Sequence, residues 1–326
     1  MTSYIVRRFL YMLMLLALTS LVAFMVIVLP PGDFLTAYAN QLRAQGDISE
    51  QELESLRHLY GLDRPMYVQY YKWVTNFIRG DLGMSFNWSR PVSELIGERL
   101  GMTILVSVAA LLVTYLIAVP VGIYSATHQY SGGDYFFTFI AFIGMSVPNF
   151  LLALILMIAL NKTLGLSIGG LFSVEFKAEP WSAAKAVDLL KHLPIPLLVI
   201  GLSGTASIMR IMRGMLLDEL NKPYVTTARA KGLTERKLLF KYPVRIALNP
   251  IASTIGWALP AVFSGQTIVS IVLDLPTIGP LLYQALMSED MFLAASAIMI
   301  TTSLTVVGMF LSDMLLAWLD PRITYT

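Results

Sequence analysis

Residues that commonly do chemistry are sparse in this chain, and their spacing matches no catalytic or metal-binding motif. The 326 residues include no cysteine and three histidines, which lie 70 and 64 residues apart, so no HExxH zinc spacing exists. Four titratable residues of one loop could form an acid–base site: Glu175, Glu179, Asp188 and His192. Because their spacing fits no known motif, a solvated surface is the favoured interpretation, and a membrane enzyme stays an alternative.

Basic side chains are concentrated in residues 210–245, which hold nine Lys or Arg against three Asp or Glu. From Tyr224 to Pro250 the sequence reads YVTTARAKGLTERKLLFKYPVRIALNP. Pro223 suits the first turn of a helix, Gly232 suits its end, and Thr234 suits the cap of a second helix. The pattern therefore predicts two short helices that lead directly into an apolar run.

Small residues occur on one face of the first of these helices. Tyr224, Ala228 and Gly232 are spaced by four and share a face, and Ala230 is also small. The arrangement predicts a short, rigid peg that a partner protein can approach closely. A basic loop resting on anionic lipid is the alternative, although lipid contact favours large apolar residues on one side.

Six apolar runs must position this basic segment. Hydrophobic residues make up 56% of the chain and charged residues 13%, about half the 25% of a soluble domain. This composition excludes an ordinary soluble domain and a disordered chain, and the net charge of +2 gives no indication of nucleic-acid binding. We expect membrane-spanning helices at 9–29, 101–125, 135–160, 193–213, 250–274 and 291–317. Internal prolines predict kinks at Pro120, Pro148 and Pro260.

Three regions follow from these runs. Residues 1–29 form the cytoplasmic N-terminus and first membrane helix, which we interpret as an uncleaved signal anchor. Residues 30–99 form a small polar extracytoplasmic lobe with a helix over 49–59, and residues 100–326 form a core of five membrane helices with the loop 214–249. The excess of Lys and Arg places that loop and both termini in the cytoplasm.

The interiors of the runs lack carboxylates, which ion-coupled transporters usually keep within the membrane. The nearest exception is Asp313, which lies near the cytoplasmic end of the last run. A secondary transporter is therefore a distant alternative. Polar residues that could line a wet passage include Ser146, Asn149, Ser253 and Gln266. The competing interpretation for each is a helix–helix contact, where small polar residues are common.

The basic segment resembles the cytoplasmic coupling loop of permease subunits of binding-protein-dependent ABC importers. The resemblance is strongest to the B-type permease of oligopeptide and dipeptide importers. The family pattern is Glu-Ala-Ala, three residues, then Gly; here Thr226, Thr227 and Ala228 occupy the triplet and Gly232 the glycine. The string TARAKGL at 227–233 is the version typical of peptide importers.

Further matches, in the same order as in the family, extend the resemblance to nearly the whole chain: Tyr60–Pro65, Gly80–Ser85, Ser146–Phe150, Arg210, Arg213 and Asp320–Arg322. Four positions depart from the family pattern, which has Ala, Asn, Glu and Gly where this chain has Pro243, Ile246, Ser270 and Thr277. These departures leave the substrate open.

The resemblance implies an all-α membrane protein with six transmembrane helices and the type I ABC importer permease fold. It also implies a multi-pass subunit of the bacterial inner membrane, paired with a second homologous permease, two ABC ATPase subunits and an extracytoplasmic solute-binding protein. ATP and Mg would bind the partner ATPases, so this chain would have no cofactor and no enzyme activity. Peptides are the substrate of the family by default, and oligosaccharides, opines, murein peptides and nickel chelates are alternatives.

The same resemblance assigns two groups of contact residues. The residues expected to couple to an ATPase are Tyr224, Thr227, Ala228, Arg229, Ala230, Lys231, Gly232 and Leu233. Asp81 and Glu94 of the outer lobe are expected to contact the binding protein.

Overall fold

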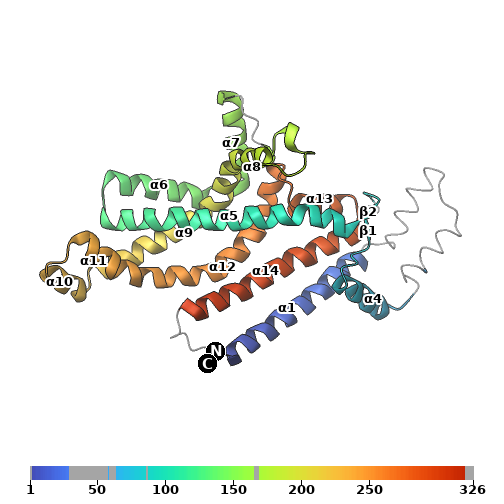
Figure 1. Ribbon diagram of the computed structural model, residues 1–326, viewed down its shortest axis with the longest axis horizontal. Coiled ribbons are helices and arrows are strands. Elements are labelled where there is room, and N and C mark those ends of the chain that lie inside the picture. The colour runs from blue at the N-terminus through green and yellow to red at the C-terminus, as the bar shows by residue number, and fades with distance from the viewer. Residues whose placement is uncertain (1, 29–57, 59–63, 86, 165–168, 320–326) are drawn as a thin grey trace. The chain divides into compact units, whose positions relative to one another are not determined.

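The computed structural model describes residues 2–28, 58, 64–85, 87–164 and 169–319, and these are mostly helical (Figure 1). The chain divides into two compact units. Unit 1 comprises Met1–Tyr4, Ile104–Pro276 and Gly308–Thr326, and unit 2 comprises Ile5–Thr103 and Thr277–Val307. Apart from His58, the helix expected over 49–59 lies outside the described residues, as does the match at Asp320–Arg322.

Unit 1 is built around one long helix, α9 (Pro194–Leu220), which contacts α6, α7, α8 and α12. Its other elements are most of α5 (Val92–Thr127), α6 (Gly132–Ser146), α7 (Asn149–Leu164), a 3-10 turn (Val174–Phe176), α8 (Ala183–His192), α10 (Pro223–Ala230), α11 (Glu235–Lys241) and α12 (Pro243–Val272). The short helices α10 and α11 project beyond the ends of the long ones (Figure 1).

Unit 2 packs a short hairpin and two short helices against parts of three long ones. Its elements are most of α1 (Thr2–Val28), α4 (Met66–Ile78), β1 (Met84–Ser85), β2 (Arg90–Pro91), the start of α5, α13 (Ile278–Met287) and the first part of α14 (Met291–Leu319). The strands pair antiparallel, with Met84 opposite Pro91. The sequence did not predict α4 or α13, because α4 falls within the expected polar lobe and α13 within a loop between two apolar runs.

The six predicted spans correspond to the long helices. Four of these, α1, α5, α9 and α14, are each long and apolar enough to cross a membrane. Two further spans result if each bent pair of helices counts as one: α6 with α7, and Glu235–Ile255 with Pro260–Val272.

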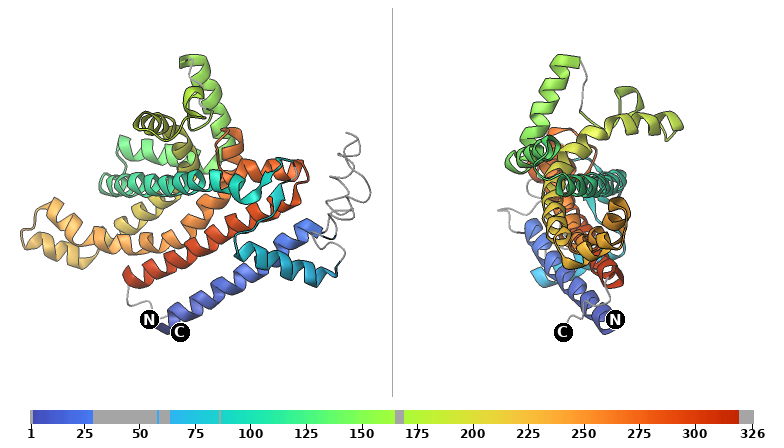
Figure 2. Two further views of the ribbon diagram at one scale, coloured as in Figure 1. Left: turned by 45° about the vertical axis from the view of Figure 1, so that its right-hand side comes forward. Right: turned by 90° about the vertical axis from the view of Figure 1, so that its left-hand side faces the viewer.

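The third span is not the single helix that the sequence predicted over 135–160. The chain bends by 110° between α6 and α7, where Pro148 interrupts the helix (Figure 2). The predicted kink at Pro260 corresponds to the second bend, of 49°. Pro120 lies inside α5, which continues as a helix through that position. A proline removes one backbone hydrogen bond, and neighbouring helices decide whether the helix then breaks.

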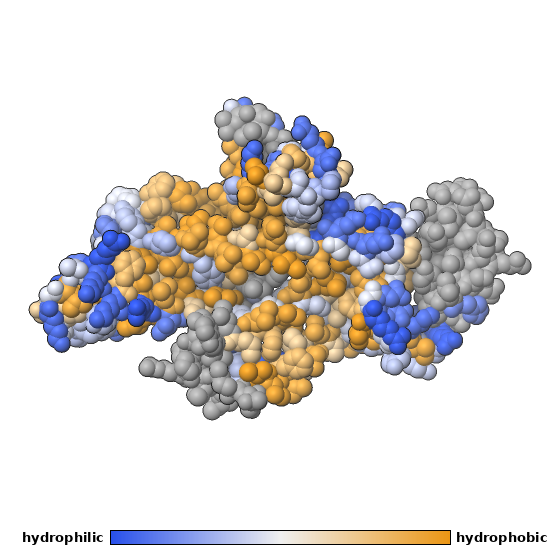
Figure 3. All heavy atoms as spheres, viewed as in Figure 1, coloured by the Kyte–Doolittle hydropathy of each residue, from blue (hydrophilic) through white to orange (hydrophobic). Residues whose placement is uncertain are grey.

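Close helix contacts hold unit 1 together at glycines. A Cβ atom on Gly122 of α5 would lie 2.7 Å from Met212 of α9, and one on Gly144 of α6 would lie 2.7 Å from Leu202 of α9. Glycine permits this approach because it has no side chain. The surface over α5, α6 and α9 is hydrophobic, whereas α10 and α11 are strongly hydrophilic (Figure 3). This contrast is expected if the long helices face lipid and the short ones face water.

Candidate functional site

Local backbone chemistry sets the bounds of α10. Pro223 opens the helix in its first turn, where its missing N–H is not needed. At the other end Gly232 has a φ of +80° and donates its N–H to the carbonyl of Arg229 at 3.0 Å. Nothing lies within 4 Å of the place where a Cβ on Gly232 would be. Glycine is therefore favoured here by its left-handed conformation, not by lack of space.

Helices α10 and α11 share a small core of their own. Val225, Ala228 and Leu238 are 0%, 8% and 1% exposed. The rings of Tyr224 and Tyr242 pack beside them, edge to face at 6.5 Å. The predicted cap residue Thr234 stands at the start of α11, but its side chain makes no capping hydrogen bond. Burial of these apolar groups stabilises the two helices as one unit.

Two polar contacts link α10 to its neighbouring helices. Arg229 Nη2 lies 3.0 Å from Glu235 Oε2 and joins α10 to the start of α11. The Tyr224 hydroxyl donates to Glu219 Oε2 at 2.6 Å and joins α10 to the end of α9. Burial and the neighbouring Glu219 carboxylate raise the pKa of Tyr224 to about 12. The Tyr224 hydroxyl therefore keeps its proton at physiological pH and continues to donate this hydrogen bond.

The open face of α10 differs from the one that the sequence predicted. Ala228 is buried against α11, so it is not available to a partner. The exposed small residues are Thr226, Thr227 and Ala230, followed by Lys231 and Gly232. Because the Thr227 hydroxyl donates to the carbonyl of Pro223 at 3.0 Å, this side chain is already satisfied within the helix. The resulting surface is small, rigid and basic at its end.

Two membrane helices are joined to this loop by short connections. Only Asn221 and Lys222 separate α9 from α10, and only Tyr242 separates α11 from α12. Helices α9 and α12 also pack directly against each other. A force applied to α10 therefore reaches both helices through short, ordered segments.

A hollow of about 150 Å³, lined mostly by apolar side chains and by four polar ones, lies among the helices of unit 1. Its polar lining comes from three helices: Thr114 of α5, Asn149 of α7, and Ser203 and Ser207 of α9. Within the described part of the chain, the amide of Asn149 and the hydroxyl of Ser203 make no hydrogen bond. These groups can therefore form hydrogen bonds with a solute without first breaking hydrogen bonds within the protein.

Of the four residues that the sequence suggested for a passage, only Asn149 lines this hollow. Gln266 is buried and accepts a hydrogen bond from Ser107 at 3.1 Å, while Ser146 and Ser253 are exposed elsewhere. Sequence reasoning missed Ser203 and Ser207, although their spacing of four on an apolar helix places them on one face.

The two outer-lobe residues of unit 2 are both exposed. Asp81 follows α4, and its Oδ1 accepts the N–H of Gly83 at 3.1 Å. Glu94 lies in the first turn of α5, 3.3 Å from Arg90, which also pairs with Glu98 at 2.7 Å. Exposed ion pairs add little stability, so these charges are available for recognition.

The acid–base candidates form no catalytic arrangement among the described residues. Glu175 and Glu179 are exposed. Asp188 accepts the N–H and the hydroxyl of Ser173 at 2.8 and 2.7 Å and lies beside His192. Burial alone would raise the pKa of Asp188, but the two hydrogen bonds from Ser173 and the positive charge of Lys191 outweigh it and lower the pKa. A carboxylate held in this way fixes the turn before α8.

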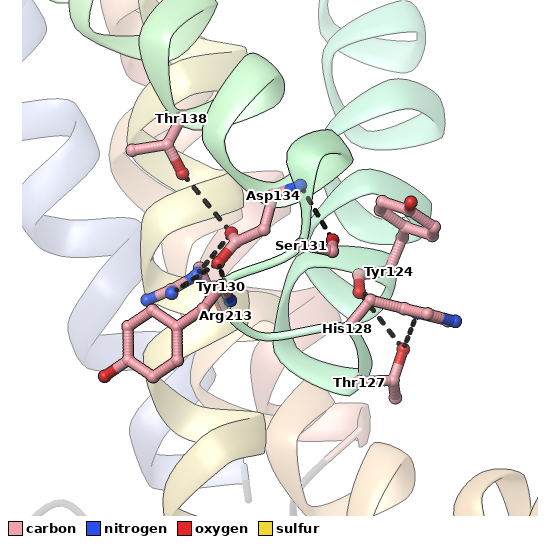
Figure 4. Close-up of polar contacts among 8 residues, drawn as sticks. All are labelled: Tyr124, Thr127, His128, Tyr130, Ser131, Asp134, Thr138 and Arg213. Atoms are coloured by element: carbon pink, nitrogen blue, oxygen red, sulfur yellow. Dashed lines mark hydrogen bonds and ion pairs between the residues drawn. The ribbon is translucent and has the colours of Figure 1, made fainter.

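A buried charge cluster at the start of α6 was missed by the sequence analysis (Figure 4). Asp134 is 1% exposed, and Arg213 of α9 donates to both its carboxylate oxygens, at 3.0 and 2.9 Å. The backbone N–H of Tyr130 and the hydroxyl of Thr138 also donate to this carboxylate, at 3.0 and 3.4 Å. The available signal was Ser131, a residue type that suits a helix N-cap, followed three residues later by a lone acid.

Residues 118–325 match the family described as the binding-protein-dependent transport system inner membrane component. The chain belongs to this family. Residues 1–109 match the N-terminal region described for the same transport systems. As a member of this inner-membrane family with several apolar helices, the chain is a multi-pass membrane permease.

Three relatives match the permease over its full length. It is 35% identical to the oligopeptide transport system permease protein AppB of Bacillus subtilis, over 100% of both chains. It is 36% identical to a putative peptide permease protein of Brucella ovis, again over 100% of both chains. It is 29% identical to the peptidoglycan transport system permease protein YejB of Agrobacterium fabrum, over 100% of this chain and 99% of the relative.

Proposed function

We propose that this permease is one of two membrane subunits of an ATP-driven importer that carries peptides into the cell. The observation that carries the proposal is the full-length similarity to an oligopeptide permease, together with a rigid basic loop that bears an exposed small-residue face. ATP and Mg are bound and used by two partner ATPases, and this chain is not an enzyme. A second homologous permease completes the translocation path.

The α10–α11 loop supplies the contact with one ATPase in this proposal. The contact surface comprises Thr226, Thr227, Ala230, Lys231 and Gly232, all exposed. Binding of ATP closes the ATPases, and the closure displaces α10. Because α9 leads directly into α10 and α11 leads directly into α12, the displacement moves both long helices between inward-open and outward-open states, as rigid-body alternating access requires. The loop and both termini then lie in the cytoplasm.

The hollow beside Asn149 contributes part of the passage for the peptide. Its lining is uncharged, with hydroxyl and amide groups on small and apolar surroundings. Such groups can form hydrogen bonds with the peptide backbone, which is the same in every peptide. They do not select for particular side chains of the peptide. Selectivity among peptides then rests with the extracytoplasmic binding protein.

Asn149→Asp is expected to change this selectivity. A carboxylate at about 10 Å from an acidic peptide side chain costs about 1.7 kcal/mol at an effective dielectric constant of about 20, or roughly fifteenfold in rate. Uptake of acidic peptides should fall by this order relative to basic peptides of the same length. Asn149→Leu, which has the same shape without charge, should slow all peptides alike. Equal uptake of acidic and basic peptides by Asn149→Asp would place Asn149 outside the passage.

The outer lobe contacts the binding protein in this proposal, through Asp81 and Glu94. Asp81→Lys and Glu94→Lys are each expected to reduce solute-stimulated ATP hydrolysis roughly fivefold, with basal hydrolysis unchanged. Glu98→Lys is the matched control, since Glu98 pairs with the same Arg90 but is not a proposed contact. Normal stimulation in both variants would remove these two residues from the interface.

The proposal is tested by gentle extraction of the tagged chain from its native host and identification by mass of the proteins that co-purify. Two ATPases and a second permease are the expected partners. Recovery of the chain alone, or only with copies of itself, would contradict the proposal.

A second candidate substrate follows from the relative named for peptidoglycan transport. Murein-derived peptides have the same backbone amides and would fit the same neutral hollow. The identity of the ligand held by the co-purified binding protein distinguishes the two: an ordinary peptide supports the first candidate, and a peptide with D-residues or amino sugars supports the second.

A further inference from the structure

We propose that the Asp134–Arg213 pair carries the movement of the coupling loop to helix α6, and through α6 to the hollow at Asn149. Both are positioning residues, because neither lines the hollow or lies in the α10–α11 loop. The inference rests on the proposed function, since it needs a moving α10. Four features of unit 1 support it: the geometry of the pair, a second attachment of α6, the link from α9 to α10, and the place where α6 ends.

The geometry of the pair resists sliding between helices. Arg213 donates through both Nε and Nη2 to the two oxygens of one carboxylate. A two-pronged contact of this kind fixes orientation as well as distance. The same carboxylate accepts the N–H of Tyr130, which has a φ of +64° and closes the turn before α6. The Asp134 carboxylate therefore holds α9, the turn and the start of α6 in one arrangement (Figure 4).

Helix α6 is attached to α9 at a second place. Gly144, near the other end of α6, packs closely on Leu202 of α9. From Asp134 to Gly144 is ten residues, about 15 Å of helix, and from Leu202 to Arg213 is eleven, about 16 Å. Because these lengths match and the order is reversed, the helices run antiparallel in register between the two contacts. The charge pair fixes one end of α6 and glycine packing fixes the other.

The coupling loop reaches Arg213 without a flexible segment. Tyr224 of α10 bonds to Glu219 of α9, which lies six residues, or about 9 Å of helix, beyond Arg213. A displacement of α10 is therefore passed to α9 close to the charge pair. Packed helices can shift past each other in small steps, and the two-pronged contact opposes such a shift between α9 and α6.

The far end of α6 leads directly to the hollow. Helix α6 ends at Ser146, and after Val147 and Pro148 the next helix begins with Asn149. Asn149 lines the hollow together with Ser203 and Ser207 of α9. If α6 follows α9, Asn149 keeps its place in the lining through the transport cycle. If α6 lags behind α9, the lining is disrupted while the ATPases continue to work.

The test is the number of peptides transported per ATP hydrolysed, measured on the assembled importer in lipid vesicles. Asp134→Asn is expected to lower this ratio roughly fivefold or more, the scale of a typical coupling effect. A purely structural role would reduce the amount of assembled complex and leave the ratio in the surviving complexes unchanged. Asp188→Asn is the matched control, since Asp188 is also a buried carboxylate with several hydrogen bonds but lies outside this route. It should keep the wild-type ratio.

A second variant protects the test against failed assembly. Arg213→Lys keeps the charge but cannot make the two-pronged contact, and it is expected to lower the ratio by a smaller factor than Asp134→Asn. A wild-type ratio in the assembled variants would overturn the inference and leave the proposed function intact. If the wild-type complex itself shows no ATP-dependent uptake, the proposed function fails instead.

Discussion

Ala230→Trp is expected to abolish solute-stimulated ATP hydrolysis while the chain remains folded and inserted. Ala230 is exposed at the end of α10 and takes no part in the small core formed by Val225, Ala228 and Leu238. A tryptophan there does not disturb the loop itself. It does fill space that the proposed ATPase surface must occupy, and overpacking of a close interface costs about 1–3 kcal/mol or more. We expect at least about a tenfold loss of stimulation.

The measurement compares ATP hydrolysis with and without binding protein and peptide, in vesicles that contain equal amounts of the chain. Ala230→Ser is the matched control, because it changes the same position with almost no change in volume, and it should be stimulated normally. Co-purification should show fewer ATPase subunits bound to Ala230→Trp. Full stimulation of Ala230→Trp would mean that α10 is not the contact with the ATPase.

Asp290→Asn is expected to destabilise unit 2 and to uncouple the binding protein. Asp290 is 3% exposed and accepts hydrogen bonds from the hydroxyl of Ser85 and the N–H of Leu293, the latter at 3.2 Å. These bonds join the β1–β2 hairpin to the start of α14. The asparagine amide has one oxygen that can accept these hydrogen bonds, and its NH2 group would face the Ser85 or Leu293 donor. We expect this mismatch to lower the free energy of unfolding by about 2–3 kcal/mol.

Thermal inactivation of the extracted protein measures this loss of stability. Glu289→Gln is the matched control, because it removes one charge from the exposed neighbouring residue and should leave the inactivation temperature unchanged. We also expect stimulation by the binding protein to fall in Asp290→Asn, since the hairpin begins three residues after Asp81. Equal stability of the two variants would show that the buried bonds of Asp290 contribute little.

Local chemistry explains which parts of the coupling loop were predictable. Pro223 and Gly232 mark the start and end of α10 because their backbone preferences act within one residue. The prediction of the open face of α10 was wrong because helical spacing shows which residues share a face, not which part of the protein that face contacts. The contact of Ala228 with Leu238 of α11 depends on how the chain folds back after Gly232, and this is a tertiary event.

The hollow at Asn149 and the Asp134–Arg213 pair could not be predicted for a related reason. The hollow requires Thr114, Asn149, Ser203 and Ser207 from three helices to converge, and the sequence gives no register between those helices. Asp134 separates two apolar runs in the sequence, so it marks only their boundary there. Only the fold shows that Arg213, 79 residues later, meets it. The six apolar runs were predictable because a membrane imposes their length and composition.

Peptide accumulation in vesicles tests the central claim most directly. The assembled importer is reconstituted with ATP trapped inside and with peptide and binding protein outside. We predict that peptide accumulates in the lumen only when both ATP and the binding protein are present. Accumulation that needs neither of them and instead follows an imposed proton or sodium gradient would contradict the account.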